Sequence, residues 1–295
     1  MRILIIGCGY VGLAAGAKLA RLGHEVSGLR RSTAGHAELA AAGMTPLTAD
    51  ITRPETLAGL PGNWDSVVNT AAASGGSAED YRRLYLEGAR NLAAWLTNAR
   101  LGKYIYTSST GVYGQNDGSW VDETGATEPT SPTARILVET EQTLLDVARH
   151  KDFPAVILRI AGIYGPGRGY YLRQMLNEEA RIEGTGERFI NMVHRDDVAG
   201  AIVAALERAT PGTICNVCDD EPVTQLELYT WLARYLGRDL PPHVAETPEI
   251  LRRRAVTNKR ISNRKLRTEL ACALEYPTFR EGYAAELARL GYRGR

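Results

Sequence analysis

The chain has 295 residues, and its 35 lysines and arginines nearly balance its 34 aspartates and glutamates, for a formal net charge of +1. This balance excludes a general electrostatic attraction to nucleic acid or to an anionic membrane surface, so we expect neither as a partner. Four cysteines are too few for a disulfide scaffold, and no stretch reaches the ~20 apolar residues of a membrane helix, which together predict a cytoplasmic protein.

Strand-like apolar runs alternate with helical patterns over the first 165 residues. In chain order, strands are expected at residues 2–7, 24–30, 44–50, 65–71, 103–109 and 154–162. Helical patterns lie between them at residues 12–23, 33–42, 78–100 and 133–150, with a further short helix opened by Thr52 and Glu55 at capping-box spacing. Apolar strands that alternate with helices are typical of a parallel sheet covered on both faces. The sequence therefore predicts an α/β fold with a doubly wound parallel sheet.

The regular alternation ends near residue 165, where a glycine-rich stretch begins. Beyond it, helices are expected near residues 169–183, 195–208 and 224–236, between short strand-like pieces. We interpret residues 166–295 as a smaller, mixed C-terminal lobe that returns a strand and a helix to the main sheet. Because no long linker separates this lobe from residues 1–165, the two parts should form one rigid body with a cleft between them.

Residues 7–12 carry a GxGxxG pattern directly after the first strand. Gly7 permits the turn, Gly9 lets the backbone approach a pyrophosphate, and Gly12 lets the following helix pack closely. The N-terminus of that helix, at Tyr10 and Val11, favours an anion. In this position the pattern indicates a dinucleotide-binding site, and a purely structural turn is the alternative.

The end of the second strand bears on the choice of cofactor. NAD sites usually place Asp or Glu there, about 20 residues after the glycines, to bind the ribose hydroxyls. This chain has Arg30, Arg31 and Ser32 instead, which suit a 2′-phosphate through charge-assisted hydrogen bonds. We therefore predict NADP, with NAD less favoured, and the alternative is a solvated pair of arginines at a strand end.

Four further motifs occur in a fixed order along the chain. They are NTAAA at 69–73, TSSTGVYG at 107–114, RIAGIYGP at 159–166 and HRDDVA at 194–199. Together with GCGYVG they resemble the extended short-chain dehydrogenases/reductases, the NAD(P)-dependent epimerase/dehydratase family, and among these the atypical members. The resemblance covers nearly the whole chain. It implies a Rossmann-type fold, an NAD(P)-binding domain over residues 1–165 and a substrate lobe over residues 166–295.

Family roles carry over only to positions where the residues match. The resemblance implies that Asp50 contacts the adenine, although it could equally cap the next turn. It implies that Ala71 and Ala72 line the cofactor and that Ser109 hydrogen-bonds the substrate oxygen near the nicotinamide. For Ser109 the alternative is a buried serine that bonds only to backbone.

The motif that usually supplies the catalytic acid is degenerate. The Tyr-x-x-x-Lys register of the family falls on Thr133 and Leu137, and the asparagine often found in the preceding helix is replaced by Tyr85. A nearby cation tunes a phenol toward the working pH, and threonine with leucine cannot reproduce that chemistry. We therefore expect hydride transfer here to rely on Ser109 to polarise the substrate oxygen, with water or the substrate itself supplying the proton.

Three other residues are candidates for acid–base chemistry at the site, and two cysteines have the spacing of a metal or redox motif. Tyr113 and Tyr164 lie in loops at the C-terminal ends of strands, where open sheets bind ligands, although both also suit packing roles. His194 has a more suitable intrinsic pKa, yet it stands at a helix start. Cys215 and Cys218 have CxxC spacing, but on a strand they would face opposite sides, so we expect no metal site.

These features favour an NADP-dependent oxidoreductase or epimerase/dehydratase-like enzyme that acts on a small polar substrate, with a sugar or sugar nucleotide among the candidates. The alternative is a catalytically silent NADP-binding sensor or scaffold, which the loss of both Tyr and Lys favours. Several arginines of the lobe could meet a substrate phosphate: Arg168, Arg173, Arg181 and Arg188. The helices at 78–100 and 133–150 match those that pair across family dimers and carry wide apolar stripes, so a homodimer is expected.

Overall fold

A seven-stranded parallel sheet forms the centre of the molecule. The computed structural model describes residues 1–73, 76–245 and 257–294. In space the strands run in the order β12-β7-β5-β4-β1-β2-β3, and each neighbouring pair is parallel. Their bounds are β1 Arg2–Ile6, β2 Glu25–Arg30, β3 Thr45–Thr48, β4 Ser66–Asn69, β5 Lys103–Ser109, β7 Ala155–Ile160 and β12 Ile214–Val217. This order confirms the predicted doubly wound α/β sheet.

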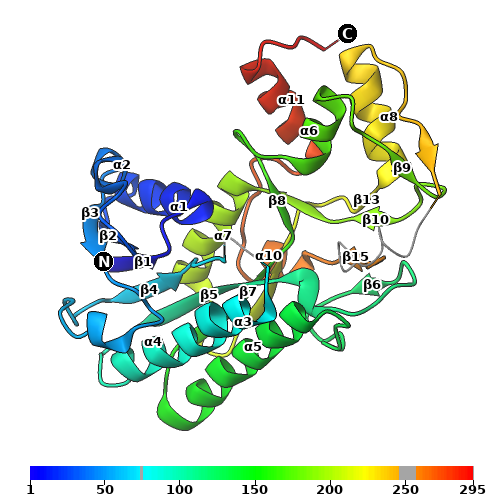
Figure 1. Ribbon diagram of the computed structural model, residues 1–295. Coiled ribbons are helices and arrows are strands. Elements are labelled where there is room, and N and C mark those ends of the chain that lie inside the picture. Colours follow the sequence, from blue (N-terminus) through cyan, green and yellow to red (C-terminus); the bar gives the residue numbers. More distant parts are fainter. Residues whose placement is uncertain (74–75, 246–256, 295) are drawn as a thin grey trace.

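Helices cover both faces of the sheet, and the alternation of side chains along the strands explains why both faces are apolar. In β1, Ile3 and Ile5 join the core cluster beneath α1 (Tyr10–Arg21) and α7 (Arg195–Arg208), whereas Leu4 and Ile6 join the cluster on the other face. That second face is covered by α4 (Gly88–Leu96) and α5 (Pro132–Lys151), as Figure 1 shows. The small helix α2 (His36–Ala41) packs Leu39 into the first cluster.

The long helix before β5 is interrupted by a π turn. It begins as α3 (Ala78–Tyr81), continues through the π-helical turn η2 (Arg82–Glu87) and ends as α4. Ser77 caps its N-terminus by accepting a hydrogen bond from the Asp80 backbone N–H. Single π turns within α-helices occur frequently at functional sites.

The remaining elements build a smaller lobe around its own core, at the upper right of Figure 1. Its helices are α6 (Tyr170–Leu176), α8 (Gln225–Leu236) and α11 (Phe279–Arg289), whereas α10 (Arg264–Thr268) buries Leu266 in the first core cluster of the main sheet. The short strands outside the main sheet pair as β11 (Met192–His194) with β8 (Gly162–Tyr164), β10 (Phe189–Ile190) with β13 (Val223–Thr224), β14 (His243–Val244) with β9 (Ile182–Glu183), and β15 (Arg260–Ile261) with β6 (Trp120–Val121). The last pair buries Ile261 and Val121 in the first core cluster of the main sheet. Two elements from residues beyond 165, the helix α7 and the strand β12, belong to the main sheet and its core. The division into two domains at residue 165 stays a prediction. In the described residues no helix is long and apolar enough to cross a membrane.

Two predicted helices differ from the observed ones. The helix expected near 169–183 ends at Leu176, because Glu178 takes a φ of 61° that a right-handed helix cannot contain. The capping box expected at Thr52 and Glu55 is absent: the Thr52 hydroxyl donates to Asp50 Oδ1, and only the short 3₁₀ turn η1 (Pro54–Thr56) follows. A second 3₁₀ turn, η3 (Thr110–Val112), follows β5.

A buried ion pair ties α5 to the centre of the sheet. Arg159 of β7 donates to both carboxylate oxygens of Glu141, and the two side chains are only 5% and 3% exposed. Ser108 also donates to Glu141, at 2.5 Å, while Arg159 donates to the Tyr113 hydroxyl at 2.8 Å. Tyr113 in turn donates to Asn216 Oδ1 in β12, so one hydrogen-bonded network joins β5, β7, β12 and α5.

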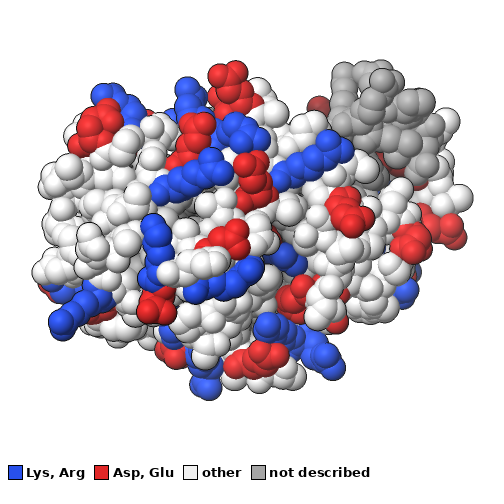
Figure 2. All heavy atoms as spheres, turned by 90° about the horizontal axis from the view of Figure 1, so that it is seen from below, with Lys and Arg blue, Asp and Glu red and all other residues white. Residues whose placement is uncertain are grey.

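The outer surface of α5 carries charges rather than a wide apolar stripe. Glu139 forms ion pairs with Arg82 and Arg90 of the neighbouring helix, at 3.0 and 3.5 Å. Within the described ranges, none of the large exposed hydrophobic side chains belongs to residues 78–100 or 133–150. Viewed from this side of the molecule, Figure 2 shows basic and acidic groups interspersed without a patch of one sign. The homodimer stays a prediction, because the described residues of these helices do not expose the wide apolar stripe on which it was based.

We predict that Glu141→Leu lowers the free energy of unfolding by about 3–5 kcal/mol, because it leaves the Arg159 guanidinium buried without a counter-charge. Glu139→Leu is the matched control on the same helix, and its exposed ion pairs should contribute no more than about 1 kcal/mol. Adding Arg159→Met to Glu141→Leu should recover much of the loss. Urea unfolding followed by circular dichroism measures all three, and equal losses from Glu141→Leu and Glu139→Leu would contradict the prediction.

Candidate functional site

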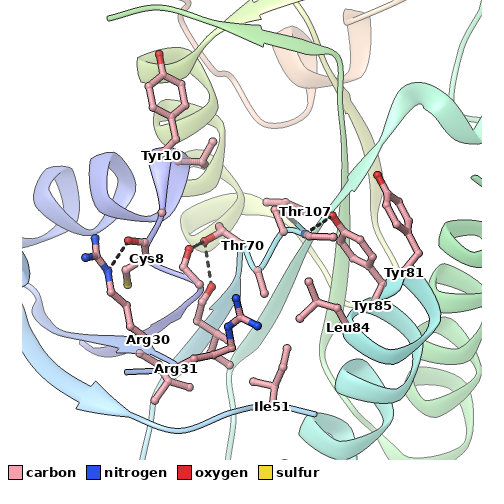
Figure 3. A pocket seen from close by; sticks show the side chains of 18 of the residues that line it. Cys8, Tyr10, Arg30, Arg31, Ile51, Thr70, Tyr81, Leu84, Tyr85 and Thr107 are labelled. Carbon is pink, nitrogen blue, oxygen red and sulfur yellow. Dashed lines mark hydrogen bonds between the residues drawn. The ribbon is translucent and has the colours of Figure 1, made fainter. Parts of the chain in front are cut away.

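A cleft of about 1300 Å³ opens at the C-terminal ends of the central strands. Its walls come from the glycine loop, the ends of β2 and β5, the loops after β3 and β4, and the turn η2. Most residues expected at the cofactor or the substrate line it: Gly7, Gly9, Tyr10, Val11, Arg30, Arg31, Ser32, Asp50, Ala71, Ala72 and Ser109. Figure 3 shows this cleft, with the glycine loop on one side and the tyrosines of α3 and η2 on the other.

The glycines at 7 and 12 are required by the closeness of two loops. Gly7 has a φ of +79°, and a Cβ on it would lie 2.4 Å from the Ala71 Cα. A Cβ on Gly12 would lie 2.5 Å from Thr70 Oγ1 and 2.6 Å from the Gly7 carbonyl oxygen, so Gly12 packs behind the cleft rather than in its wall. The Thr70 hydroxyl lies 2.9 and 3.0 Å from the carbonyl oxygens of Gly7 and Ile6, to which it donates. Thr70 thus holds the glycine loop, a role that the sequence interpretation missed.

The start of α1 offers the features that an anion needs. Gly9 is the N-cap, no side chain caps the helix, and a Cβ on Gly9 would meet nothing within 4 Å. The first N–H groups of α1 therefore face open space, where a pyrophosphate fits with the helix dipole. Arg168 lines the cleft and lies over the Tyr10 ring at 5.2 Å, and Arg195 lies over the same ring at 5.1 Å. Arg168 is the lobe arginine that reaches this site.

The two arginines at the end of β2 have different surroundings. Arg30 donates to the Cys8 carbonyl oxygen at 2.9 Å and to Glu38 at 2.7 Å, with a longer bond of 3.4 Å to the Gly35 carbonyl. Arg31 and Ser32 are exposed, and no bond or ion pair of the Arg31 side chain forms within the described chain. Figure 3 shows Arg30 turned toward Cys8 and Arg31 directed into the cleft. Of these two arginines, Arg31 is therefore the one available to bind a ligand phosphate.

Asp50 caps the turn that follows it and also lines the cleft, while its contact with adenine stays a prediction. Its Oδ1 accepts hydrogen bonds from the Thr52 backbone N–H at 3.0 Å and from the Thr52 hydroxyl at 2.8 Å, which makes it the cap of the following turn. The residue nevertheless lines the cleft beside Ile51 and Arg53. Arg53 carries an exposed ion pair with Glu55 at 2.8 Å and is a further cation at this end of the cleft.

Ser109 stands where β5 meets the cleft. Its Oγ accepts a hydrogen bond from the Gly111 backbone N–H at 3.0 Å, so its own hydroxyl hydrogen remains available to a ligand. The helix α5 begins at Pro132 after Ser131, and its Leu137 lines the same cleft. Thr133 is absent from the wall, and its hydroxyl hydrogen-bonds to Ser131 Oγ at 2.8 Å.

The other acid candidates lie outside the cleft wall. Tyr113 is fully buried in the ion-pair network, and burial raises its pKa although Arg159 lowers it. Tyr164 is 2% exposed, its hydroxyl donates to the Thr278 carbonyl oxygen at 3.3 Å, and burial raises its pKa well above the usual range. His194 accepts from the Asp196 N–H as the N-cap of α7, and burial lowers its pKa. All three have structural partners.

Comparison with known proteins identifies the family. The model of the NAD dependent epimerase/dehydratase family matches residues 3–218. The chain belongs to this family.

Relatives match over nearly the full length. Protein YeeZ from Escherichia coli K12 is 28% identical over 94% of this chain and 96% of its own. A solved structure of a functionally unknown conserved protein from Silicibacter pomeroyi is 30% identical, with a TM-score of 0.77 over 98% of this chain and 99% of that one. UDP-glucuronic acid 4-epimerase from Bacillus cereus, solved with UDP-glucuronic acid and NAD, shares the fold at 22% identity, with a TM-score of 0.82 over 99% of both chains.

Within this epimerase/dehydratase family member, two tyrosines of the long helix also line the cleft. Tyr81 ends α3 and Tyr85 lies in the π turn, and their ring centroids are 4.9 Å apart. The Ala73 backbone N–H donates to the Tyr85 hydroxyl at 3.1 Å. From the sequence, both belong to an apolar stripe of helical spacing that predicts only packing, and nothing in the pattern indicates the π turn.

The cysteines have no feature of a reactive or metal-binding site. Cys8 lines the cleft, but burial raises the pKa of its thiol to about 12, and the thiol donates to the Ile5 carbonyl oxygen. Cys215 and Cys218 are buried, with thiol pKa values raised by burial. Among the described residues, no group of three or more His, Cys, Asp or Glu side chains could hold a metal ion.

We predict that Gly12→Ala lowers the free energy of unfolding by about 1–3 kcal/mol, because the new methyl group overlaps Thr70 Oγ1 and a backbone oxygen. Binding of the nicotinamide dinucleotide should weaken as well, since the glycine loop must shift. The control is Gly200→Ala in α7, where the nearest atom to a new Cβ is 3.7 Å away and the change should stay within about 1 kcal/mol. Urea unfolding and NADPH fluorescence give the two readings. Equal stability of both variants would contradict the close approach.

Proposed function

We propose that this chain is an NADP(H)-dependent oxidoreductase or epimerase/dehydratase-like enzyme that acts on a sugar nucleotide or a related small polar substrate. The observation that supports it most is the single cleft in which an uncapped helix N-terminus, a free arginine and the Ser109 hydroxyl meet. The helix N-terminus and the arginine would bind the phosphates of a dinucleotide, and the Ser109 hydroxyl would bind a polar substrate in the same cleft.

The size of the cleft supports two ligands bound together. Its volume of about 1300 Å³ is larger than the ~300–1,000 Å³ of common small-molecule pockets. The Bacillus cereus epimerase of the same fold holds a sugar nucleotide and a dinucleotide at once. A sugar nucleotide is therefore the first substrate class to test.

The choice of NADP is supported by Arg31, Ser32 and Arg53 at the end of the cleft that follows β2 and β3. A 2′-phosphate would gain charge-assisted hydrogen bonds there, whereas the ribose hydroxyls of NAD would meet no carboxylate on β2 after Glu25. Arg30 contributes indirectly, because its bonds to Cys8 and Glu38 hold the glycine loop and α2 together. We assign it a positioning role.

Bound nicotinamide would supply or accept the hydride at the substrate carbon. The residues of this chain orient the substrate: the Ser109 hydroxyl donates to the carbonyl oxygen, and the Gly111 N–H holds Ser109 in place by donating to its Oγ. Leu137 adds an apolar surface and no charge to the same region. The alternative of a catalytically silent NADP-binding protein is supported by Leu137 and Thr133, which stand at the positions of the family's Lys and Tyr. Tight NADPH binding without turnover of any keto sugar, imine or sugar nucleotide would favour it.

We predict that the protein binds NADPH more tightly than NADH and that Arg31→Ala removes the difference. Loss of a charge-assisted bond worth about 1.5–3 kcal/mol should weaken NADPH binding roughly 10–100-fold and leave NADH binding unchanged. Arg30→Ala is the contrasting variant, because losing its protein contacts should weaken both cofactors to a similar extent. Fluorescence titration measures the affinities. If Arg31→Ala affects both cofactors equally, the phosphate contact is wrong.

We predict that Ser109→Ala lowers the rate of the reductive step by about 10²–10³-fold, since one donor to the developing oxyanion is lost. Ser108→Ala is the neighbouring comparison: Ser108 bonds to Glu141, so its loss should lower stability with a much smaller effect on rate. Stopped-flow oxidation of NADPH, with NADPH affinity measured in parallel, separates the two effects. A Ser109→Ala enzyme of unchanged rate would exclude Ser109 from the reaction.

A further inference from the structure

The two motif positions that supply the proton in the family hold no acid in this chain. Thr133 is turned to Ser131 and Leu137 offers no charge, so neither can serve a substrate oxygen held by Ser109. We propose that Tyr85 is the catalytic acid and base of this enzyme, exchanging the proton of its hydroxyl with the substrate oxygen that Ser109 polarises. The inference rests on the proposed function and replaces water or substrate as the source of the proton.

The position of Tyr85 is the first support. It lies in the wall of the same cleft as Ser109 and Thr107, which stand at the end of β5. Figure 3 shows Tyr85 reaching from the helix toward this strand end and toward the loop after β4. The ring packs against both core clusters of the main sheet, which fixes its direction.

The hydrogen bond of Tyr85 leaves its proton free. The Ala73 backbone N–H donates to the phenol oxygen at 3.1 Å, so the oxygen is the acceptor in this bond. Among the described residues no acceptor is bonded to the hydroxyl hydrogen. The same N–H would stabilise the phenolate left after proton donation, in the way that backbone donors stabilise oxyanions elsewhere.

The ionisation of Tyr85 fits an acid that keeps its proton until it is needed. Burial raises its pKa, the hydrogen bond from Ala73 opposes that effect, and Tyr81 adds a small further rise. The phenol therefore stays protonated near neutral pH and gives up its proton only to an oxygen that is gaining charge.

The π turn supplies a second, independent observation. It is confined to Arg82–Glu87 within an otherwise α-helical segment, and Tyr85 lies inside it. A π turn rotates the side chains it contains relative to a regular helix and is found mostly where function requires it. At the turn that contains Tyr85, the regular α-helical hydrogen bonds are replaced by those of a π turn.

The other phenols fit the role less well. The hydroxyls of Tyr113 and Tyr164 are already donated to Asn216 Oδ1 and to the Thr278 carbonyl oxygen, away from the cleft wall. Tyr10 lines the cleft at the glycine loop, beneath Arg168 and Arg195. Tyr81 lies beside Tyr85, but no backbone N–H donates to its oxygen within the described residues.

The proposed step balances. In the reducing direction the carbonyl carbon accepts a hydride from the reduced nicotinamide dinucleotide, and the carbonyl oxygen accepts the proton of Tyr85. The carbonyl becomes an alcohol, the nicotinamide is oxidised, and the Tyr85 phenolate regains a proton from water. The oxidising direction is the reverse: water takes the proton of Tyr85, the resulting phenolate takes the hydroxyl proton of the alcohol, and the oxidised nicotinamide accepts the hydride.

The test uses the full chain and three proteins: wild type, Tyr85→Phe and Tyr81→Phe. The probes are NADPH and the keto sugar formed from dTDP-glucose by a dehydratase. We expect Tyr85→Phe to slow single-turnover oxidation of NADPH by about 10²–10⁴-fold, with NADPH affinity within about threefold of wild type. The loss in Tyr81→Phe should be far smaller. Equal losses in the two variants would overturn the assignment to Tyr85.

A second measurement does not depend on turnover. In the absence of cofactor, the keto sugar should change the near-ultraviolet tyrosine spectrum of wild type and of Tyr81→Phe, and this change should be lost in Tyr85→Phe. A spectral change that persists in Tyr85→Phe overturns the proposed contact. If Tyr85 only holds Ala73, Tyr85→Phe will weaken NADPH binding and leave the single-turnover rate at saturating NADPH unchanged, which also overturns it.

The two proposals fail in different ways. A wild-type protein that turns over none of the substrates contradicts the proposed function and removes the basis of the Tyr85 step. A wild-type protein that reduces the keto sugar, with the rate retained in Tyr85→Phe, contradicts the Tyr85 step alone. Circular dichroism and the urea midpoint of Tyr85→Phe show that the variant is folded, and Tyr85→Asn provides a second side chain of smaller size at the same position.

Discussion

The backbone of the glycine loop touches the loop after β4, and no side chain fits between them. β1 and β4 are parallel neighbours, with Ile6 opposite Asn69, so the loops that follow them leave the sheet at the same point. Gly7 and Gly12 allow contact there, and the Thr70 hydroxyl closes it. The start of α1, the position of the anion site and the course of residues 71–73 all follow from this one close approach. Through the bond of Ala73 to Tyr85, the long helix is fixed by it as well.

The sheet and the glycine loop could be predicted from the sequence because their signals are local. Buried parallel strands read as apolar runs, and GxGxxG after such a run has few other structural uses. The different surroundings of Arg30 and Arg31 could not be predicted, because they depend on where Glu38 and the Gly35 carbonyl lie in the folded chain. Neighbouring residues of one type look identical in a sequence, and only tertiary structure separates the bonded one from the free one.

The roles of the tyrosines show the same limit. Tyr113 and Tyr164 follow strand ends in sequence, as site residues do, yet their hydroxyls point to Asn216 and to Thr278, residues that lie far away along the chain. Tyr85 reads as one apolar position of a helical stripe, and a π turn leaves no mark in the spacing of residues. The capping box at Thr52 and Glu55 had the right spacing, but Asp50 bonded to Thr52 instead. A short polar side chain can form a hydrogen bond with several nearby groups, and residue spacing alone does not predict which of these bonds forms.

The positive charges of the cleft lie where a cofactor would bind, and not beside Ser109, where the substrate would react. The cations in the wall of the cleft, within the part of the chain that the structure describes, are arginines: Arg30, Arg31, Arg53, Arg83 and Arg168. Arg159 lies close behind Ser108 and Ser109, but Glu141 neutralises it, and its other terminal nitrogen donates to the Tyr113 hydroxyl. Among the described residues, those beside Ser109 therefore offer no free ammonium or guanidinium group, and an acid there works without the help of such a cation.

The return of β12 to the sheet affects how the chain can be made. Residues 155–160 form β7, which is buried along its whole length, and its outer neighbour is a strand from residues 214–217. During synthesis on the ribosome, the dinucleotide loop and five further strands emerge while β7 still presents an unpaired apolar edge. Such edges readily pair with other chains. A chain truncated shortly after residue 165 would keep this unpaired apolar edge and should aggregate, rather than fold as a small nucleotide-binding protein.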